Sequence, residues 1–195
     1  MINVNALTSD GRVRNGYELD DEDPVPDIDS ENCDEPPGGG VSPGTYACGS
    51  SAFSADACWR DADGDLVCID RPWDRKLYRR PMAGELPQTP AAEDPQPLGL
   101  QLEDGSRYRQ RNGTGVGVSP GDLNDVYYCV EGPCGDDPSK IIVVFDAIDE
   151  PTVNTTDDAW TVLVGQMLHD GSDDPSTLPE PKTRRVVRAW FITAK

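Results

Sequence analysis

Six cysteines in a chain of 195 residues constrain its fold more than any other feature. An even number suits three disulfides, which form and persist in oxidising compartments outside the cytoplasm. A zinc site is the main alternative and unpaired thiols are a third state. Zinc favours close cysteine pairs with histidine support, and the one histidine is His169, far from the cysteines in sequence. We therefore expect disulfides, no metal and no cofactor, with pairing among Cys33, Cys48, Cys58, Cys68, Cys129 and Cys134.

The clearest local signal lies in residues 57–69, where two short apolar runs flank an Ala-Asp-Gly loop. A three-residue hairpin loop of this kind ends on a left-handed glycine, here Gly64. That loop places Cys58 opposite Cys68 at a non-hydrogen-bonded pair. Cα atoms at such a pair lie about 4.5 Å apart, within the range of a disulfide. Residues 57–69 therefore predict a hairpin closed by a Cys58–Cys68 bridge.

Two more bridges follow from the remaining cysteines. Cys129 and Cys134 enclose a Gly-Pro turn, so a bridge between them closes a short loop. Cys33 and Cys48 then pair by default. Because six cysteines allow fifteen connectivities, this last pair is a remainder and has no turn signal of its own.

Strand signals dominate the rest of the chain. The 19 glycines and 18 prolines leave few windows for a long helix, and a Pro-rich connector covers residues 86–97. β-Branched and aromatic runs predict about eight or nine strands, with a hairpin at 98–110 and a final hairpin from the two longest strands. We expect a mostly β fold: an antiparallel sandwich or small barrel with disulfide-bonded hairpins. The other predicted strands cover residues 126–130, 141–145, 160–168 and 184–192.

Charge is concentrated at the start of the chain. Residues 1–45 hold eleven acidic residues against two arginines, and their composition predicts an acidic flexible tail and linker. Residues 46–195 form the predicted β-rich domain, with a disulfide hairpin subdomain at 46–85 and the main sheet at 98–195. The net charge of −19 repels phosphates and anionic membrane surfaces, so we expect no nucleic-acid partner.

Export is expected from the cysteines, although no export signal is visible. A membrane-spanning helix needs about 18 consecutive apolar residues, and no such run occurs. Met1 leads into polar residues and not into a signal peptide. We expect a secreted or cell-envelope attached protein whose leader is not in this sequence.

A basic, aromatic segment stands out in the otherwise acidic chain and is the candidate binding site. Arginine beside tryptophan or tyrosine can hold an anionic group or anchor a partner protein. The alternative is that these side chains pack on a small core and pair with acids of the same chain. The same two interpretations apply to Lys182, Arg184, Arg185 and Arg188. The candidate residues are Arg71, Trp73, Arg75, Tyr78, Arg79 and Arg80.

Signals for catalysis or metal binding are weak, and we assign no catalytic residue. Asp61, Asp63 and Asp65 resemble the start of a calcium loop, but the glycine comes too early and a proline occupies the final ligand position. A hairpin tip with solvated aspartates is favoured. His169 next to an Asp-Gly-Ser run lacks a nucleophile elbow. Carboxylate pairs for glycoside hydrolysis carry no information among 36 acidic residues.

Several short motifs are spread along the second and later parts of the chain. They are Tyr46-Ala-Cys48-Gly49, Ala55-Asp-Ala-Cys58-Trp59, Val67-Cys68 with Asp70-Arg-Pro-Trp73, Glu103-Asp-Gly105-Ser-Arg107, Trp160-Thr-Val-Leu-Val-Gly165 and Arg188-Ala-Trp190-Phe191. With these motifs the chain resembles uncharacterised secreted or lipid-anchored cell-envelope proteins of actinobacteria. The similarity spans roughly residues 46–192. It implies an envelope location and brings no activity or catalytic residue.

Together these features predict a non-enzymatic extracytoplasmic domain. We expect it to bind a protein or cell-envelope component through exposed loops or through the segment at 71–80. The alternative is a secreted cell-wall hydrolase that uses Asp/Glu pairs, which would show a deep cleft with converging carboxylates.

Overall fold

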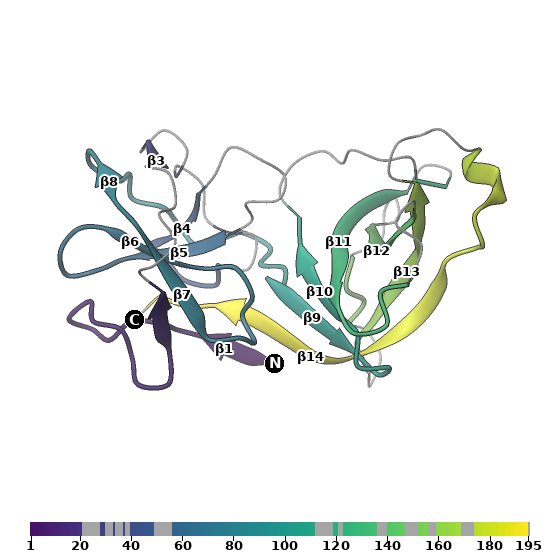
Figure 1. The fold of residues 1–195 in the computed structure, drawn as a ribbon, viewed down its shortest axis with the longest axis horizontal. Helices are drawn as coiled ribbons and strands as arrows, with labels where there is room; N and C mark the ends of the chain where they lie inside the picture. Colours follow the sequence, from purple (N-terminus) through teal and green to yellow (C-terminus); the bar gives the residue numbers. More distant parts are fainter. Residues whose placement is uncertain are drawn as a thin grey trace. The chain divides into compact units, whose positions relative to one another are not determined.

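The chain forms two compact units, which Figure 1 shows as ribbons. Unit 1 contains residues 1–98 and 190–195, and unit 2 contains residues 99–189. Among the described residues the regular elements are β-strands and one 3-10 turn at Pro175–Thr177, so the predicted mostly β class is confirmed. The computed structural model describes residues 1–20, 28–29, 33, 37, 40–48, 56–111, 119–120, 123–135, 140–146, 152–155, 159–168 and 174–194.

Unit 1 is built on a five-stranded sheet of order β2-β7-β6-β5-β4. Neighbouring strands from β7 to β4 are antiparallel, whereas β2 pairs with β7 in parallel. A separate parallel pair joins β3 (Ile28–Asp29) to β8 (Met82–Ala83). The sheet strands are β2 (Glu18–Asp20), β4 (Thr45–Cys48), β5 (Asp56–Arg60), β6 (Leu66–Ile69) and β7 (Lys76–Arg80).

The hairpin of β5 and β6 has the predicted register. Cys58 pairs with Cys68, and Gly64 has a φ of 98°, the left-handed conformation that the loop requires. The Cα atoms of the two cysteines are 4.0 Å apart, and their sulfurs are bonded. Turn chemistry and cysteine spacing therefore predicted this hairpin correctly because both act within a dozen residues.

Both faces of the five-stranded sheet are buried, which explains why β6 is buried along its whole length. Successive side chains of a strand point to opposite faces. One face carries Trp59 and Val67 in an apolar cluster, and the Trp59 indole Nε1 donates a hydrogen bond to the Thr193 carbonyl at 2.9 Å. The other face carries the Cys58–Cys68 and Cys33–Cys48 bridges with Tyr46, Leu66 and partly buried Tyr78.

The predicted flexible tail is wrong for residues 1–20. β1 (Ile2–Val4) pairs in parallel with residues 190–192, and Val4, Ala6 and Leu7 are buried in the same cluster as Trp59. The prediction was based on the composition of residues 1–45 as a whole. Ten of the eleven acidic residues of that segment follow Tyr17, so its overall acidity did not represent the first residues, which include apolar side chains. Most of residues 21–39 lie outside the described residues.

The observed units differ from the predicted division in where they place the two termini of the chain. The boundary near residue 98 agrees with the start of unit 2, but unit 1 also includes the N-terminal strands and the last six residues. The connector at 86–97 has no strand and is attached to unit 1 at Thr89, whose Oγ1 donates to the Thr45 carbonyl at 2.8 Å.

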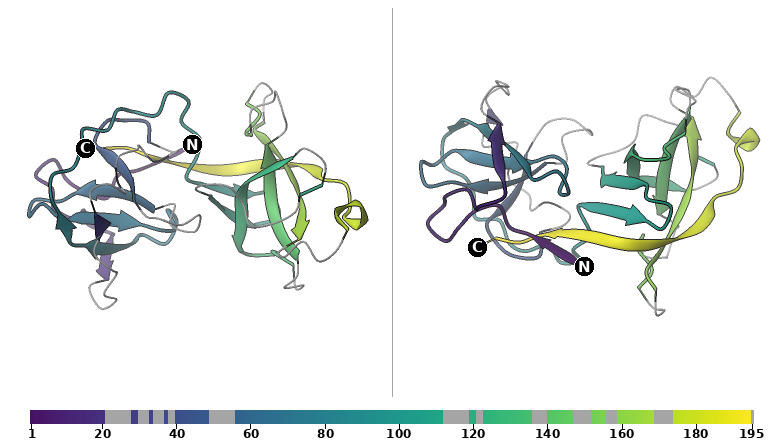
Figure 2. Two further views of the ribbon diagram at one scale, coloured as in Figure 1. Left: turned by 90° about the horizontal axis from the view of Figure 1, so that it is seen from above. Right: turned by 60° about the horizontal axis from the view of Figure 1, so that its bottom comes forward.

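Unit 2 is a six-stranded antiparallel barrel of order β9-β10-β11-β12-β13-β14, closed because β14 also pairs with β9. Figure 2 shows these strands from two further directions. Leu100 faces Tyr108, and Tyr127 faces Val144, and all four side chains are buried. The strands are β9 (Gly99–Leu102), β10 (Arg107–Gln110), β11 (Asn124–Glu131), β12 (Lys140–Asp146), β13 (Thr161–Leu168) and β14 (Lys182–Ile192).

The predicted strands and cysteine pairs of this region are confirmed. The hairpin at 98–110 is β9 and β10, and the final hairpin is β13 and β14. Cys129 bonds Cys134 with Cα atoms 5.4 Å apart. In unit 1 the remaining predicted pair, Cys33 with Cys48, is confirmed as well. No helix among the described residues is long and apolar enough to span a membrane.

Leu7→Ala tests whether the N-terminal residues belong to the core. Leu7 is fully buried, so we expect its truncation to lower the free energy of unfolding of unit 1 by about 2–5 kcal/mol. Urea unfolding followed by tryptophan fluorescence reports on unit 1 through Trp59, Trp73 and Trp190. Ile2→Ala is the control, because Ile2 is 39% exposed and its loss should cost about 0.5 kcal/mol. Equal stability of the two variants would contradict the assignment.

Candidate functional site

The six residues of the predicted basic, aromatic site lie on β7 and on the turn that precedes it. The turn is closed by a hydrogen bond from the Asp74 amide to the Arg71 carbonyl at 3.1 Å. Arg75 ends the turn with a φ of 56°, and its carbonyl accepts from the Glu18 amide at 3.0 Å. β7 then carries alternate side chains to the two faces of the sheet.

The structure does not gather these six side chains on one surface. Trp73 packs on the cluster that contains Trp59, with its ring centroid 5.4 Å from that of Trp190. Tyr78 packs on the opposite face, against the disulfide cluster. An extended aromatic and cationic surface over residues 71–80 is therefore not formed within the described residues.

The four arginines of the site each contact groups of their own unit. Arg71 lies 3.6 Å from Asp70 and 3.9 Å from Asp74. The guanidinium of Arg75 lies 6.0 Å from the Tyr17 ring, and that of Arg80 lies 5.0 Å from the Tyr78 ring. These contacts match the intramolecular alternative of the sequence analysis. They do not test whether a partner also binds there, and the predicted site stays a prediction.

Asp61 is the organising residue of the hairpin tip. Its Oδ1 accepts hydrogen bonds from the amides of Asp63, Gly64 and Asp65 at 2.9–3.0 Å. Its Oδ2 accepts from Arg79, and the Asp61 side chain is only 5% exposed. The carboxylate is thus a cap for the turn rather than the solvated aspartate that we expected, and both of its oxygens are used by donors of the protein.

A second polar cluster is buried in unit 2, and sequence analysis did not predict it. Arg111 pairs with Asp125, and the two side chains are 5% and 9% exposed. Arg109 is also buried and donates to the Tyr128 hydroxyl at 3.1 Å. Burial lowers the pKa of Arg111, since a charged guanidinium loses hydration there. The arginines alternate along the strand in sequence, but their partners lie on β11, which the sequence could not place.

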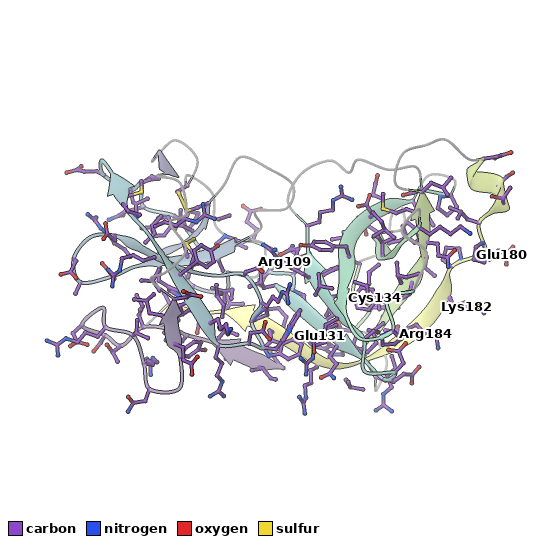
Figure 3. The ribbon with its side chains drawn as sticks, in the orientation of Figure 1. Arg109, Glu131, Cys134, Glu180, Lys182 and Arg184 are labelled. Atoms are coloured by element: carbon purple, nitrogen blue, oxygen red, sulfur yellow. A yellow bond between two sulfur atoms is a disulfide. The ribbon has the colours of Figure 1, made fainter. Side chains whose placement is uncertain are left out.

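The clearest exposed cations lie on β14. We call Lys182, Arg184, Arg185 and Arg188 the cationic strand; all four are exposed, and Val187 between them is 50% exposed. None of the four has an ion pair with another described residue. Figure 3 labels Lys182 and Arg184 at the start of this strand and Glu180 shortly before it.

The cationic strand adjoins the turn between β9 and β10. The Glu103 amide donates to the Arg185 carbonyl at 3.1 Å, which holds the turn to the strand. Burial alone would raise the pKa of Asp104, but hydrogen bonds from Ser106 and the charge of Arg184 outweigh burial and lower it. The charge of Arg184 therefore favours the ionised form of Asp104 from a distance, and the two side chains form no close ion pair.

The hydrolase alternative stays a prediction. A shallow depression of about 470 Å³ is lined by Thr8, Asp10 and residues 12–15, and its one carboxylate lies 3.4 Å from Arg12. Within the described part of the chain, no group of three His, Cys, Asp or Glu side chains is placed to hold a metal ion. His169 lies outside the described residues.

Asp61→Ala tests the capping role of the hairpin tip. We expect a loss of about 1–3 kcal/mol in the free energy of unfolding, because three amides lose their acceptor and Arg79 loses its hydrogen bond to Asp61. Asp61→Asn should lose less, since its Oδ1 still accepts while the charge opposite Arg79 is gone. Thermal unfolding of the disulfide-bonded protein measures both. Asp63→Ala is the matched control at an exposed position, and an equal loss there would refute the cap.

Comparison with known proteins gives no relative for the chain. It matches no protein-family model, no curated protein and no solved structure. The similarity to actinobacterial envelope proteins therefore rests on short sequence motifs and stays a prediction.

Proposed function

We propose that this chain is a non-enzymatic binding domain that works outside the cytoplasm and that its cationic strand contacts a linear anionic polymer of the cell envelope. The observation that carries the proposal is the group of four exposed cations without ion pairs in the described structure. Envelope location is part of the proposal and is supported by three disulfides and by the similarity to envelope proteins.

The contrast with other cations of the chain supports a binding role. Acidic residues outnumber basic ones 36 to 17, so an acid is near most basic side chains. Several cations elsewhere in the described residues are engaged at close range, as in Arg79 with Asp61, Arg107 with Glu131 at 2.7 Å and Arg111 with Asp125. A run of exposed cations without such pairing leaves its positive charge available to an external anion.

The geometry of the cationic strand favours an extended ligand. A strand rises about 3.3 Å per residue, so Lys182 and Arg188 are separated by about 20 Å along the backbone. Strand alternation places Lys182, Arg184 and Arg188 on one side and Arg185 on the other. A polymer with repeated negative groups can therefore meet three cations along one side, whereas a single small anion would need a concave site.

The side-chain types indicate the chemistry of the ligand. Three of the four cations are arginines, whose planar guanidinium binds carboxylate or phosphate with two parallel hydrogen bonds. Exposed Val187 adds an apolar contact of the kind that the carbon face of a sugar can use. The net charge of −19 repels a densely charged nucleic acid more than a sparsely charged glycan. We therefore favour an anionic glycan or polyol phosphate.

Charge reversal tests the proposal in the first half of the cationic strand and in the second half separately. We expect Lys182→Glu/Arg184→Glu or Arg185→Glu/Arg188→Glu to weaken binding about tenfold or more at low salt, because each replaces two attractive charges by repulsive ones. Binding of polygalacturonate and of poly(glycerol phosphate) is measured by biolayer interferometry over a salt series. The two probes distinguish a carboxylate ligand from a phosphate ligand.

The control is Arg12→Glu/Arg71→Glu, which changes the net charge by the same amount at exposed positions of unit 1. Its binding should stay within about twofold of the parent chain. Neutral dextran should not bind to any of the proteins. If both strand variants bind the anionic probes as well as the control does, or if none of the probes binds the parent, the proposal is wrong.

A further inference from the structure

We infer that Cys129–Cys134 is a thiol–disulfide exchange site, which an external dithiol opens while the two disulfides of unit 1 stay closed. This inference concerns a different site from the proposed polymer contact and does not depend on it. The substrate class is a dithiol reductant, either a small molecule or a protein with two reactive cysteines.

The three disulfides differ in their exposure. Cys33, Cys58 and Cys68 are fully buried, and Cys48 is 1% exposed. Cys129 and Cys134 are instead half-buried, and the residues between Cys134 and the end of β11 are exposed. Exchange begins when a thiolate reaches a disulfide sulfur, so access decides which bridge reacts first. Only the bridge of unit 2 offers such access in the described structure.

The surroundings of the unit 2 bridge allow it to open without loss of the fold. Cys129 lies near the end of β11, and the pairing of β11 with β10 continues through Tyr128, which faces Arg109. Cys134 belongs to the turn that follows, closed by a hydrogen bond from its amide to the Gly132 carbonyl at 2.8 Å. The bridges of unit 1, by contrast, form part of a buried cluster that opening would expose.

Opening has a local consequence at the neighbouring turn. Gly132 has a φ of 91° and lies so close to Ser106 that a Cβ there would be 3.0 Å from the Ser106 Cα. Glu131 beside it accepts a hydrogen bond from Arg107 at 2.7 Å. Figure 3 labels both Glu131 and Cys134 in this region. Loss of the bridge should therefore loosen residues 131–135 together with the turn at 103–106 on which they pack.

The chemistry is a balanced exchange. A thiolate of the reductant attacks the sulfur of Cys129 or Cys134, forms a mixed disulfide and releases the other cysteine as a thiolate. The second thiol of the reductant then displaces the attached cysteine. The reductant gives up two electrons and becomes a disulfide, and the chain gains two thiols. A disulfide oxidant reverses the reaction by the same two exchange steps and is itself reduced to a dithiol.

The test is graded reduction of the native, fully oxidised chain with dithiothreitol. Samples are quenched with iodoacetamide at intervals, and alkylation of each cysteine is measured by peptide mass spectrometry. We expect Cys129 and Cys134 to be alkylated at least about tenfold faster than the four cysteines of unit 1. Hydrogen exchange should rise at 131–135 and 103–106 while the strands of unit 1 stay protected.

Cys129→Ser/Cys134→Ser is the matched variant. It should fold, lose the fast alkylation phase and leave the slow phase of the unit 1 cysteines unchanged. Alkylation of all six cysteines at one rate would overturn the inference, as would earlier alkylation of Cys58 or Cys33. Alkylation that occurs only in denaturant would overturn it as well.

Discussion

The buried disulfide cluster on one face of the five-stranded sheet is the interaction on which unit 1 depends. A sheet with both faces covered needs apolar material on each side, and only 36% of the chain is apolar. On one face, Trp59, Val67 and Leu77 supply it together with the N-terminal residues. On the other face the sulfurs of two bridges take the place of larger side chains, since buried cystine packs as an apolar group. The bridges therefore act as packing material as well as cross-links.

The charged side chains of this chain fall into two groups, those paired near the core and those exposed on the cationic strand. Two carboxylates that approach the core, those of Asp61 and Asp125, interact with backbone amides or arginine. Such pairs are costly to bury unless each oxygen and each N–H finds a partner. The cationic strand differs because its charges lie in solvent and have no described partner. The paired carboxylates have a structural role. The cations of the cationic strand have none among the described residues, which is why we propose that they bind a ligand.

The third disulfide has a different relation to its surroundings from the other two. It closes a loop with a sequence separation of five residues at an exposed turn, whereas the bridges of unit 1 lie inside an apolar cluster. Short loops lose little entropy on closure, so a bridge across one stabilises the fold less than a bridge across a long loop. An exposed bridge of this kind holds one turn in place. The bridges of unit 1 are therefore part of an apolar core, whereas Cys129–Cys134 fixes a single turn.

Local stereochemistry determined what the sequence could predict. The register of β5 and β6, the Cys58–Cys68 bridge, the turn at 129–134 and the two hairpins of unit 2 each depend on residues within a short distance along the chain. The predicted barrel or sandwich was resolved as a barrel only when β14 paired with β9, far away in sequence. Turn geometry restricts near neighbours strongly and distant segments hardly at all.

Tertiary structure decided everything that depends on distant partners. Ile2–Val4 is too short to be predicted as a strand from the sequence. It forms a strand because it pairs with residues 190–192 and because Val4 packs in the apolar cluster. Arg111 pairs with Asp125 because β10 pairs with β11. Of the six residues at 71–80, Arg71, Trp73 and Arg75 lie in the turn before β7, and Tyr78 and Arg79 are separated because alternate positions of the strand face opposite ways. The sequence by itself determined the turns, the bridges and the strand-rich class. Packing alone decided which polar side chains are buried and that the four cations of the cationic strand lie in solvent.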